Sequence, residues 1–509
     1  MPRTEGRAAH ALAAVQRFVE TDLDRVLDER AGADPMPALL AMFHRAAAGV
    51  PAYAAFLRAR GIEPASVRGA DDWRRLPLMT RTEYFRCHPL PELCRDGDLA
   101  ACDMVAVSSG STGEPAFWPR TLTDELAVAS RFEQVFRDSF HADDRPTLAV
   151  VCFPLGTWVG GMFTAAACRH LATKGYPITV VTPGNNRAEI LRVVRALGPR
   201  FAQTVLLGYP PFLKDVVDAG IAEGFDWRTQ AMRLVLAGEV ISEDWRDLMA
   251  ERLGLGDPAR DTASLYGTAD AGVLGNETPV SIAVRRFLAR DPQAAREIFG
   301  QARLPTLVQV DPFERYFEEH DGTLVFSGDT SIPLVRYHIA DEGGILPYAA
   351  LIARLHALGF DAEAEARRGG QRGIRPLPFV YVFGRSHFAV SYYGANVFPD
   401  TVIIGLEQPA VRELVTGKFV LEVREDDDRN RELWIAVELS ARGGDAAPEP
   451  LADAVAGSIL ATLLRLNSEF ANYVPAARQR PRVTLWPTGY PEYFPVGVKH
   501  RYSRSPTGR

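Results

Sequence analysis

The chain has 509 residues with a formal net charge of −7, and 47% of its residues are hydrophobic while 24% are charged. This composition excludes a disordered tail and supplies enough apolar side chains for a large core, and the length predicts about three folding units. Because no long block of Lys and Arg occurs, we expect no nucleic-acid partner.

Five cysteines are present, an odd number, and none belongs to a CxxC pair. This pattern argues against a disulfide framework and against a zinc ribbon, and it fits a reducing cytoplasm. The N-terminus lacks the uninterrupted apolar segment of a signal peptide, and no apolar run reaches the ~20 residues of a membrane helix. We therefore expect a soluble cytoplasmic protein without a membrane partner.

The first predicted elements are helices between residues 9 and 48. Their apolar residues recur at helical spacing, and Leu12, Val15, Phe18 and Val19 are expected on one face. We interpret these helices as packing elements that carry no chemistry.

Six small residues follow a predicted buried strand at residues 104–107. Their backbone N–H groups and hydroxyls suit a nest that binds a polyphosphate. A flexible Ser/Gly linker is the alternative, although the position after a strand argues against it. The common P-loop GxxxxGK[ST] is absent because Glu114 follows the last of them. The six are Ser108, Ser109, Gly110, Ser111, Thr112 and Gly113.

Strands and helices then alternate, which predicts a parallel sheet with crossover helices. Ligands of such sheets bind beyond the carboxyl ends of the strands, so we expect the loops 156–161, 208–211, 237–239 and 266–270 to gather there. The predicted strands are 147–153, 178–181, 204–207 and 234–236, and the predicted helices are 123–140, 162–173, 187–197 and 211–222.

Residues 321–348 alternate as β-hairpins do, and residues 333–339 are predicted to form a strand that runs into Asp341. The pattern changes after Phe383. Two strands there flank a charged turn, and a helix and a last strand follow. We predict an α/β protein with a large domain of mixed or parallel sheets over residues 1–385 and a separate small α+β domain over residues 386–509. The later elements are strands 419–423, 433–439 and 482–486 and helix 452–467.

The motif SSGSTGEP at residues 108–115 resembles the phosphate loop of the adenylate-forming superfamily, which includes acyl-CoA synthetases, adenylation domains and luciferases. Within it, the SSG(S/T)TGxP pattern is similar to the phenylacetate–CoA ligase-like branch. Ala116 fits this branch, since many other members carry Lys there. Residues 50–86 resemble its entry segment, with Thr80 and Arg81 at the end of an LP-x-T motif.

Two further segments resemble the nucleotide-binding motifs of this superfamily. Residues 266–270, YGTAD, resemble YGx(T/S)E, which implies that Tyr266 lies beside the adenine and that Asp270 holds Mg²⁺ on the ATP phosphates. Ala269 lacks the hydroxyl that the family places on the α-phosphate, which leaves Thr268 or backbone N–H groups to replace it. The resemblance also assigns Gly267 to this site, together with Ala237, Gly238 and Glu239, for which a simple strand-to-helix turn capped by Glu239 is the alternative.

Residues 334–341 resemble PL(I/V)RYRTGD, which implies that Asp341 accepts the ribose hydroxyls. For an isolated Asp, a turn or a helix cap is the alternative. A segment similar to GRSDD implies that Arg385 contacts ribose and phosphate. Ser386 and His387 then form the hinge on which the small domain turns. His387 stands where the family usually has Asp.

A C-terminal segment resembles the family's GK motif with one inserted residue, which makes Lys499 the catalytic lysine. Its charge would neutralise the substrate carboxylate and the α-phosphate, whereas a merely basic tail is the alternative. Aromatic side chains are expected to enclose the acid, with core packing as the alternative. The predicted acid pocket consists of Trp158, Gly160, Tyr209 and Phe212.

This resemblance implies an enzyme that activates a carboxylic acid, expected to be aromatic or compact, as an acyl-adenylate with release of pyrophosphate. A thiol then takes the acyl group, and CoA is the expected acceptor. The implied cofactors are ATP, Mg²⁺ and CoA. A carrier-protein phosphopantetheine or an amine is an alternative acceptor. A nucleotide-binding protein without catalysis also stays open because of Ala269, His387 and the displaced Lys499.

Overall fold

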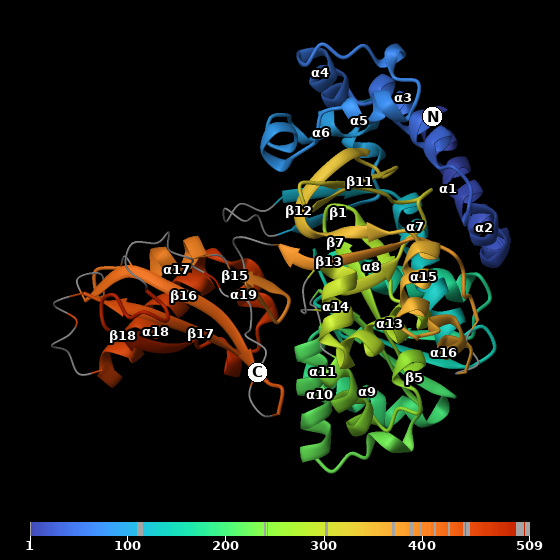
Figure 1. Cartoon of the computed structure of the whole chain (residues 1–509). Coiled ribbons are helices and arrows are strands. Elements are labelled where there is room, and N and C mark those ends of the chain that lie inside the picture. The colour runs from blue at the N-terminus through green and yellow to red at the C-terminus, as the bar shows by residue number, and fades with distance from the viewer. Residues whose placement is uncertain are drawn as a thin grey trace. The chain divides into compact units, whose positions relative to one another are not determined.

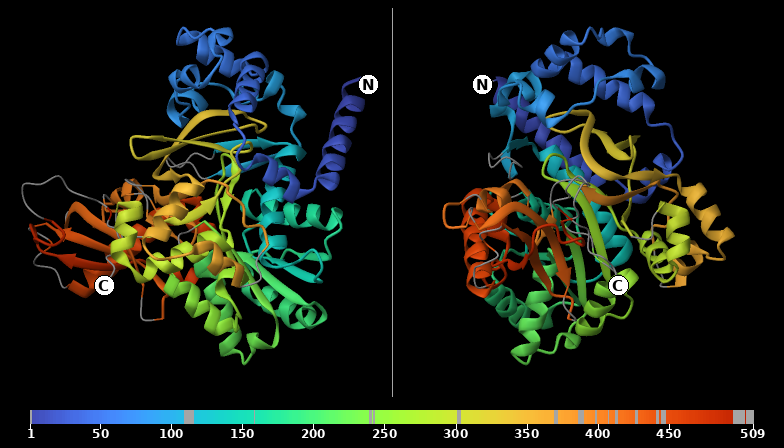
Figure 2. Two further views of the ribbon diagram at one scale, coloured as in Figure 1. Left: turned by 45° about the vertical axis from the view of Figure 1, so that its right-hand side comes forward. Right: turned by 60° about the vertical axis from the view of Figure 1, so that its left-hand side comes forward.

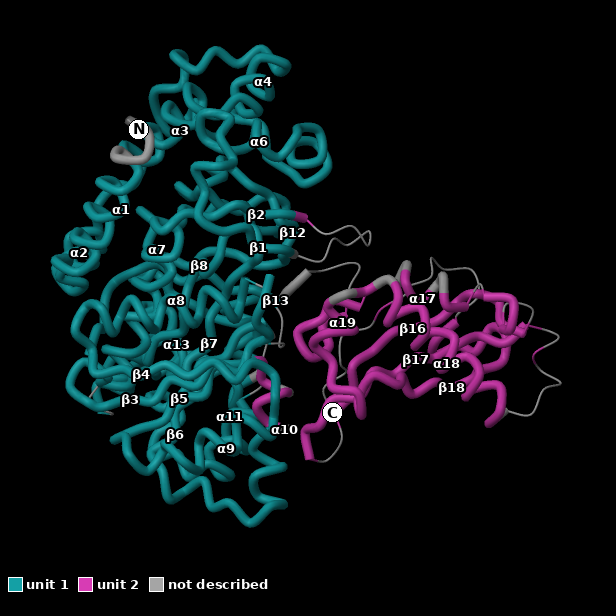
Figure 3. The backbone as a smooth tube through the Cα atoms, turned by 180° about the vertical axis from the view of Figure 1, so that it is seen from behind, with its two compact units in different colours: residues 1–108, 117–208, 216–384 teal, residues 109–116, 209–215, 385–509 magenta. Residues whose placement is uncertain are grey.

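The computed structural model divides into two compact units, drawn in two colours in Figure 3. Unit 1 comprises residues 1–108, 117–208 and 216–384, and unit 2 comprises residues 109–116, 209–215 and 385–509. Within these ranges the described residues are 2–108, 116–157, 159–238, 241, 243–300, 304–368, 372–385, 390–397, 399–406, 408–411, 414–425, 428–440, 443, 448–494 and 503.

The N-terminal segment of unit 1 is helical, as predicted, but its first helix buries a different face. Phe18 is buried, whereas Leu12 is 71% exposed and Val19 is exposed as well. Ala14, four residues before Phe18, is buried as well, because residues four apart share one face of a helix. The helices are α1 (Pro2–Glu20), α2 (Leu23–Arg30), α3 (Met36–Gly49), α4 (Pro51–Ala59), α5 (Ala70–Arg75) and α6 (Leu90–Leu93).

An eleven-stranded sheet organises the described part of unit 1 (Figure 1). Its strand order is β10-β11-β12-β13-β9-β8-β7-β6-β5-β3-β4. Strands β4, β3, β5, β6 and β7 run parallel, which confirms the predicted parallel arrangement. These five strands are β3 (Thr147–Val151), β4 (Ile178–Val181), β5 (Gln203–Gly208), β6 (Met232–Ala237) and β7 (Thr262–Thr268).

Helices connect the parallel strands, because a crossover between parallel neighbours needs an intervening element. Asn186 caps α9, and its side chain accepts a hydrogen bond from the N–H of Glu189. No helix in the described residues is both long and apolar enough to cross a membrane. The helices are α7 (Leu122–Glu133), extended by a π-helical turn at Gln134–Ser139, then α8 (Val159–Thr173), α9 (Arg187–Leu197), α10 (Pro210–Ala222), α11 (Glu243–Leu253) and α12 (Pro258–Asp261).

The remaining strands of the sheet extend it beyond β7, with antiparallel pairs β7/β8, β8/β9, β9/β13, β10/β11 and β11/β12. Strand β12 continues through Asp341, so the predicted end of this strand was wrong. Positive φ angles at Arg336 and Ala340 and a shifted register against β11 let it bend without ending. These strands are β8 (Gly272–Asn276), β9 (Thr306–Gln309), β10 (Tyr316–His320), β11 (Thr323–Gly328), β12 (Leu334–Leu346) and β13 (Phe379–Arg385), and the helices are α13 (Pro279–Arg290), α14 (Pro292–Phe299), α15 (Tyr348–Ala357) and α16 (Ala362–Arg368).

The segment before Arg81 is attached to β12. The N–H of Met79 donates to the carbonyl of Arg336 at 3.0 Å, and the carbonyl of Met79 accepts from the N–H of His338 at 2.9 Å. In both views of Figure 2 the N-terminal helices, in blue, lie next to the yellow strands of this region. These two hydrogen bonds of Met79 place Arg81, two residues later, next to the sheet.

Strand β1 (Met104–Ser108) was predicted to be buried, and this prediction was wrong. Among residues 104–107 Ala106 is the one buried residue, and Val105 is 39% exposed. The reason is that β1 pairs with β2 (Ala116–Arg120) in a two-stranded sheet and not with the strands of the main sheet.

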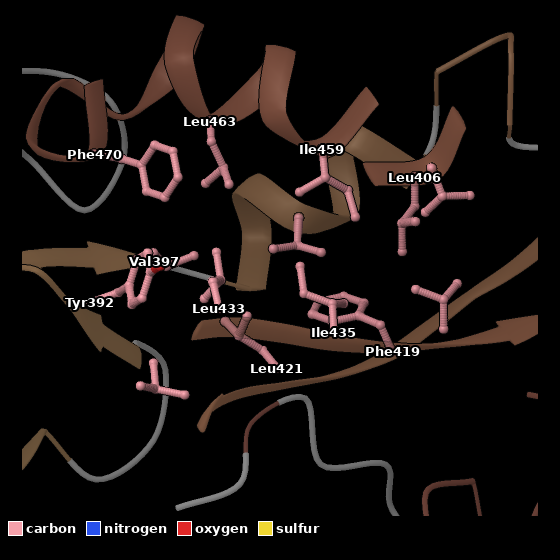
Figure 4. Packing of buried hydrophobic residues seen from close by; sticks show 14 of the residues in the cluster. Tyr392, Val397, Leu406, Phe419, Leu421, Leu433, Ile435, Ile459, Leu463 and Phe470 are labelled. Carbon is pink, nitrogen blue, oxygen red and sulfur yellow. The ribbon is translucent and has the colours of Figure 1, made fainter. Parts of the chain in front are cut away.

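Unit 2 has α+β composition, as predicted. In its three-stranded sheet β16 pairs antiparallel with β17, and β17 pairs parallel with β18. Figure 4 shows apolar side chains that alternate along the first two strands, Phe419 and Leu421 and then Leu433 and Ile435, and that pack with Ile459. The elements are β14 (Val390–Tyr392), β15 (Ala395–Val397), α17 (Pro399–Leu406), β16 (Val415–Glu425), β17 (Arg431–Leu439), α18 (Pro448–Leu466), α19 (Ser468–Tyr473) and β18 (Arg482–Trp486).

Candidate functional site

Strands β3, β5, β6 and β7 are parallel neighbours, so their carboxyl ends share one edge of the sheet. This edge is where a ligand of such a sheet is expected. Strand β7 supplies Tyr266, Gly267 and Thr268, and the turn to β8 supplies Ala269 and Asp270.

Asp270 lies in a buried ion pair. Its side chain is 1% exposed, and Arg81 Nη2 lies 2.6 Å from its Oδ1, with Arg81 Nε 3.3 Å from its Oδ2. The hydroxyl of Tyr337 donates a further hydrogen bond to Oδ2. Burial disfavours the charge of Arg81, but the carboxylate of Asp270 outweighs it, so the pKa of Arg81 is raised. The pair is therefore a charge-assisted contact that fixes the carboxylate.

Two more buried arginines hold the backbone of the same turn. Arg120 Nη2 donates to the carbonyls of Ala269 and Asp270, each at 2.6 Å. Arg315 Nη2 donates to the carbonyl of Ala271 at 3.0 Å. Burial lowers the pKa of both guanidiniums, since neither charge is exposed to water. Three consecutive carbonyls are thus fixed by side chains from distant segments.

The side chain of Trp118 lies near two of these cations. The guanidinium of Arg81 is 5.8 Å from its ring and that of Arg120 is 6.0 Å from it. Such distances allow cation–π attraction. Because Trp118 and Arg120 both belong to β2, the strand that follows the predicted phosphate loop is linked to the turn that carries Asp270.

Thr268 has a hydroxyl next to the turn. Its Oγ1 accepts a hydrogen bond from the N–H of Ala271 at 3.2 Å, and the residue is half-buried. Gly267 is exposed, yet a Cβ at this position would lie 2.8 Å from the carbonyl oxygen of Gly272. This contact explains why glycine stands there.

Tyr266 and Asp341 are in direct contact. The tyrosine hydroxyl donates to Asp341 Oδ2 at 2.7 Å, and both side chains are buried. These residues are 75 positions apart in the sequence, and the resemblance assigned both to the same nucleotide. The fold therefore brings two predicted binding residues together.

Strand β6 ends at Ala237, and Gly238 follows with a φ of 91°. This left-handed conformation favours glycine and turns the chain at the carboxyl edge of the sheet. Glu239 lies outside the described residues, so its predicted place in the nucleotide site and the alternative role as a helix cap both stay untested.

The predicted acid pocket is only partly described. Gly160 lies in the first turn of α8, and Phe212 lies in α10, where it is buried. Tyr209 belongs to unit 2, and its ring centre is 5.4 Å from that of Tyr473. The pocket itself stays a prediction.

Several predicted residues lie outside what the structure describes, and their roles stay predictions. For Ser108 and Arg385 the backbone is described but not the side chain. Beyond the described residues altogether are Ser109, Gly110, Ser111, Thr112, Gly113, Trp158, Glu239, Ser386, His387 and Lys499.

The sequence reasoning missed Arg120, Arg315 and Tyr337. Tyr337 lies within the RYHIAD motif, and its position could have been noted there. Arg120 ends the strand after the predicted phosphate loop, but its contacts lie 149 and 150 residues away and follow from the fold alone.

The described residues contain no group of three or more His, Cys, Asp or Glu placed to hold a metal. Asp270 offers the oxygen ligands that Mg²⁺ prefers, and Mg²⁺ commonly takes one or two carboxylates along with substrate phosphates. Both of its oxygens already accept hydrogen bonds from Arg81 and Tyr337. A magnesium ion at Asp270 would therefore compete with the guanidinium of Arg81.

No family model matches the chain. A phenylacetate-coenzyme A ligase of Thermus thermophilus is 24% identical over 390 residues, which are 76% of this chain and 77% of that ligase. Among solved structures, a 2-hydroxyisobutyryl-CoA ligase in complex with 2-HIB-AMP and CoA has a TM-score of 0.64 at 14% identity, covering 96% of this chain and 92% of that chain.

The same 2-hydroxyisobutyryl-CoA ligase, solved in its postadenylation state with 2-HIB-AMP, gives a TM-score of 0.51 at 14% identity and covers 93% of this chain and 88% of that chain. The likeness to these structures lies in the fold. The predicted resemblance is confirmed: this chain has the fold of the adenylate-forming CoA ligases, and its sequence is similar to their phenylacetate–CoA ligase-like branch.

Proposed function

We propose that this chain is an AMP-forming acid–thiol ligase. It uses ATP to convert a carboxylic acid into an acyl-adenylate and pyrophosphate, and it then transfers the acyl group to CoA. The observation that carries the proposal is the hydrogen bond between Tyr266 and Asp341, which joins two motifs assigned to one nucleotide. The similarity to a phenylacetate-coenzyme A ligase supports the reaction class.

We assign the ribose and the adenine of ATP to the pair formed by Tyr266 and Asp341. A buried carboxylate that is held by a tyrosine hydroxyl can accept hydrogen bonds from neighbouring hydroxyls of a ribose. Asp341 has this environment, because Tyr266 fixes its Oδ2. The ring of Tyr266 is then positioned beside the adenine.

In the first step a carboxylate oxygen of the acid attacks the α-phosphorus of ATP. A new P–O bond forms, and the bond to the bridging oxygen breaks, so that pyrophosphate leaves with the electron pair. Both reactants are anions, so catalysis depends on position and on neutralised charge. Lys499 supplies a cation between the two anions, and a Mg²⁺ ion held at Asp270 would neutralise charge on the ATP phosphates.

In the second step the CoA sulfur, as thiolate, attacks the acyl carbon, and AMP leaves. We assign the hinge to Ser386 and His387, where the small domain turns between the two steps. We assign the acid as aromatic or compact, because the sequence places flat side chains, Trp158 and Tyr209 among them, in the loops predicted to bind it. The name of the Thermus relative supports an aromatic acid.

The proposal is tested with purified protein, MgATP and a panel of aromatic and short aliphatic acids, with and without CoA. Pyrophosphate release that depends on one class of acid, and acyl-CoA detected by mass spectrometry when CoA is present, are expected. Acid-dependent pyrophosphate release without acyl-CoA, but with an amide or a loaded carrier protein, would replace CoA by another acceptor. ATP binding without pyrophosphate release for any acid would make the chain a nucleotide-binding protein.

A further inference from the structure

Arg120 is a buried cation without an ion-pair partner among the described residues. Its side chain is 1% exposed, and its hydrogen bonds go to backbone carbonyls. Its Nε has no hydrogen-bond partner. Burying a charge in this way costs free energy, and a neutral amide side chain could tie the same carbonyls at lower cost. The charge itself therefore calls for an explanation.

The peptide between Asp270 and Ala271 connects Arg120 to Thr268. The carbonyl of this peptide accepts from Arg120 Nη2 at 2.6 Å, and its N–H donates to Thr268 Oγ1 at 3.2 Å. The peptide is trans, so its carbonyl and N–H point in opposite directions. Hydrogen bonds in such a chain polarise one another, and a cation at one end strengthens the donor at the other.

The hydroxyl of Thr268 accepts within the turn and keeps its own hydrogen for donation. A hydroxyl has one hydrogen to donate, and among the described residues none accepts it from Thr268. The residue ends β7 at the carboxyl edge of the sheet, one position before Ala269. A phosphate oxygen of a ligand bound at this edge could accept the hydrogen bond that the Thr268 hydroxyl is able to donate.

We propose that Arg120 is a positioning residue of the ATP site, which polarises the Asp270–Ala271 peptide and so strengthens the hydrogen bond that Thr268 donates to a phosphate oxygen of ATP. The inference rests on the proposed function for the identity of the nucleotide. It also explains how this chain provides a hydroxyl that donates to the phosphate although Ala269 has none. Arg120 touches no substrate and acts through Thr268.

Arg315 provides a matched control. It is also a buried guanidinium, its Nε also lacks a partner, and its Nη2 donates to the next carbonyl of the turn, that of Ala271. The N–H of that peptide belongs to Gly272 and not to the residue that donates to Thr268. Loss of the Arg315 charge therefore disturbs the same turn without reaching the Thr268 hydroxyl.

The test measures MgATP affinity by calorimetry in a double-mutant cycle of Thr268→Val with Arg120→Gln. Thr268→Val is expected to weaken ATP about tenfold in the wild-type background, as the loss of a charge-assisted hydrogen bond does. In Arg120→Gln the same change is expected to weaken ATP only about twofold to threefold, since the hydroxyl is no longer polarised. In Arg315→Gln the loss stays about tenfold.

Two further measurements separate the hydroxyl from a general effect on the turn. Thr268→Val should leave the affinity for adenosine unchanged, because adenosine has no phosphate, and Thr268→Ser should bind ATP as the wild type does. An equal loss from Thr268→Val in the wild type and in Arg120→Gln would overturn the proposal and leave Arg120 a structural residue. Unchanged ATP affinity in Thr268→Val would overturn it as well.

If Arg120→Gln does not fold, Arg120→Lys carries the comparison. Lysine keeps the charge, so Thr268→Val should still weaken ATP about tenfold in this background, and a loss below about threefold would overturn the proposal. The proposed ligase function is judged separately by acid-dependent pyrophosphate release in the wild type. A missing coupling together with intact pyrophosphate release would reject the role of Arg120 alone.

Discussion

Arg81 Nη2 lies 2.6 Å from Asp270 Oδ1, so the carboxylate that the resemblance assigns to Mg²⁺ is already neutralised by a guanidinium. The pair is buried on the side of Asp270, and Tyr337 completes it. A metal ion at Asp270 would compete with Arg81 for the same oxygens, and this competition can be measured.

Arg81→Met is expected to destabilise the protein in the absence of metal by about 3–5 kcal/mol, because it leaves the buried charge of Asp270 unpaired. Added Mg²⁺ should then raise the melting temperature of Arg81→Met more than that of the wild type. The measurement is a Mg²⁺ titration followed by thermal denaturation. The control is Arg81→Met with Asp270→Asn, which should lose the response. An equal response of wild type and Arg81→Met would remove Asp270 as a metal ligand.

Asp341→Ala should weaken ATP binding by about 1–3 kcal/mol, because the ribose hydroxyls lose their acceptor and the hydroxyl of Tyr266 loses its partner. Calorimetry with ATP and with 2′,3′-dideoxy-ATP measures the effect. The dideoxy nucleotide should bind the wild type weakly, and Asp341→Ala should reduce its affinity much less than that of ATP. If both nucleotides lose the same affinity, Asp341 acts on the fold and not on the ribose.

Lys499→Ala should abolish formation of the acyl-adenylate but spare thioester formation from a supplied acyl-adenylate, because its charge is needed where two anions meet. Each half-reaction is followed separately, by pyrophosphate release and by acyl-CoA. Arg501→Ala, in the same basic tail, is the control and should affect neither. A similar loss in both half-reactions would contradict a role limited to the first step.

Glu277 belongs to a buried cluster of charged side chains that makes the stability of the protein depend on pH. It is fully buried, with Arg246 Nη2 at 2.8 Å and Arg285 Nη1 at 3.0 Å. Burial disfavours its charge, but the two arginines outweigh it, so the pKa of Glu277 is lowered from 4.5. A lowered pKa adds stability that is complete above the unfolded value and is lost as the pH falls through the folded value.

We therefore expect the free energy of unfolding of the wild type to fall as the pH drops below 4.5. Glu277→Gln should cost about 3–5 kcal/mol at pH 7, since Glu243 alone would then remain to pair with both buried arginines. It should also show a shallower loss of stability in acid than the wild type. Urea denaturation between pH 3 and pH 7 measures both, and parallel pH profiles of the two proteins would show that Glu277 carries no pH-dependent stability.

Wild type should prefer aromatic or compact acids, and Trp158→Ala should shift this preference towards bulkier acids, because Trp158 is the proposed wall of the acid pocket. A chain-length series of acids, read by pyrophosphate release, measures the preference of both proteins. Preference of the wild type for acids of about twelve or more carbons would contradict the compact pocket. So would a Trp158→Ala protein that is destabilised but unchanged in acid preference.

Local sequence patterns predicted most elements because their causes are local. Strand β4 at Ile178–Val181 and helix α9 at Arg187–Leu197 have their predicted bounds, since an apolar run defines the strand and the Asn186 cap with a regular apolar face defines the helix. The exposure of Val105 could not be predicted, because it depends on which sheet its strand joins. The motif resemblance assigned Tyr266 and Asp341 to one nucleotide, and in the structure their side chains share a hydrogen bond.

The rest of the site depends on contacts between segments that are far apart in the chain. Arg120 meets the turn at residues 269–270 across 149 and 150 positions, and nothing in the residues around it indicates that partner. The pairing of Arg81 with Asp270 spans 189 positions. Both contacts depend on how β2 and the segment before Arg81 are placed against the sheet, which periodicity does not encode.

Gly267 is a solvent-exposed position that nevertheless accepts only one residue type. The position is exposed, so side-chain burial alone would mark it as tolerant of any residue. Its limit comes from the carbonyl oxygen of Gly272, which would lie 2.8 Å from any Cβ. Every residue type other than glycine carries that atom, so alanine is as badly accommodated as tryptophan. Variants chosen by surface accessibility at this rim would therefore disturb the path of β7 itself.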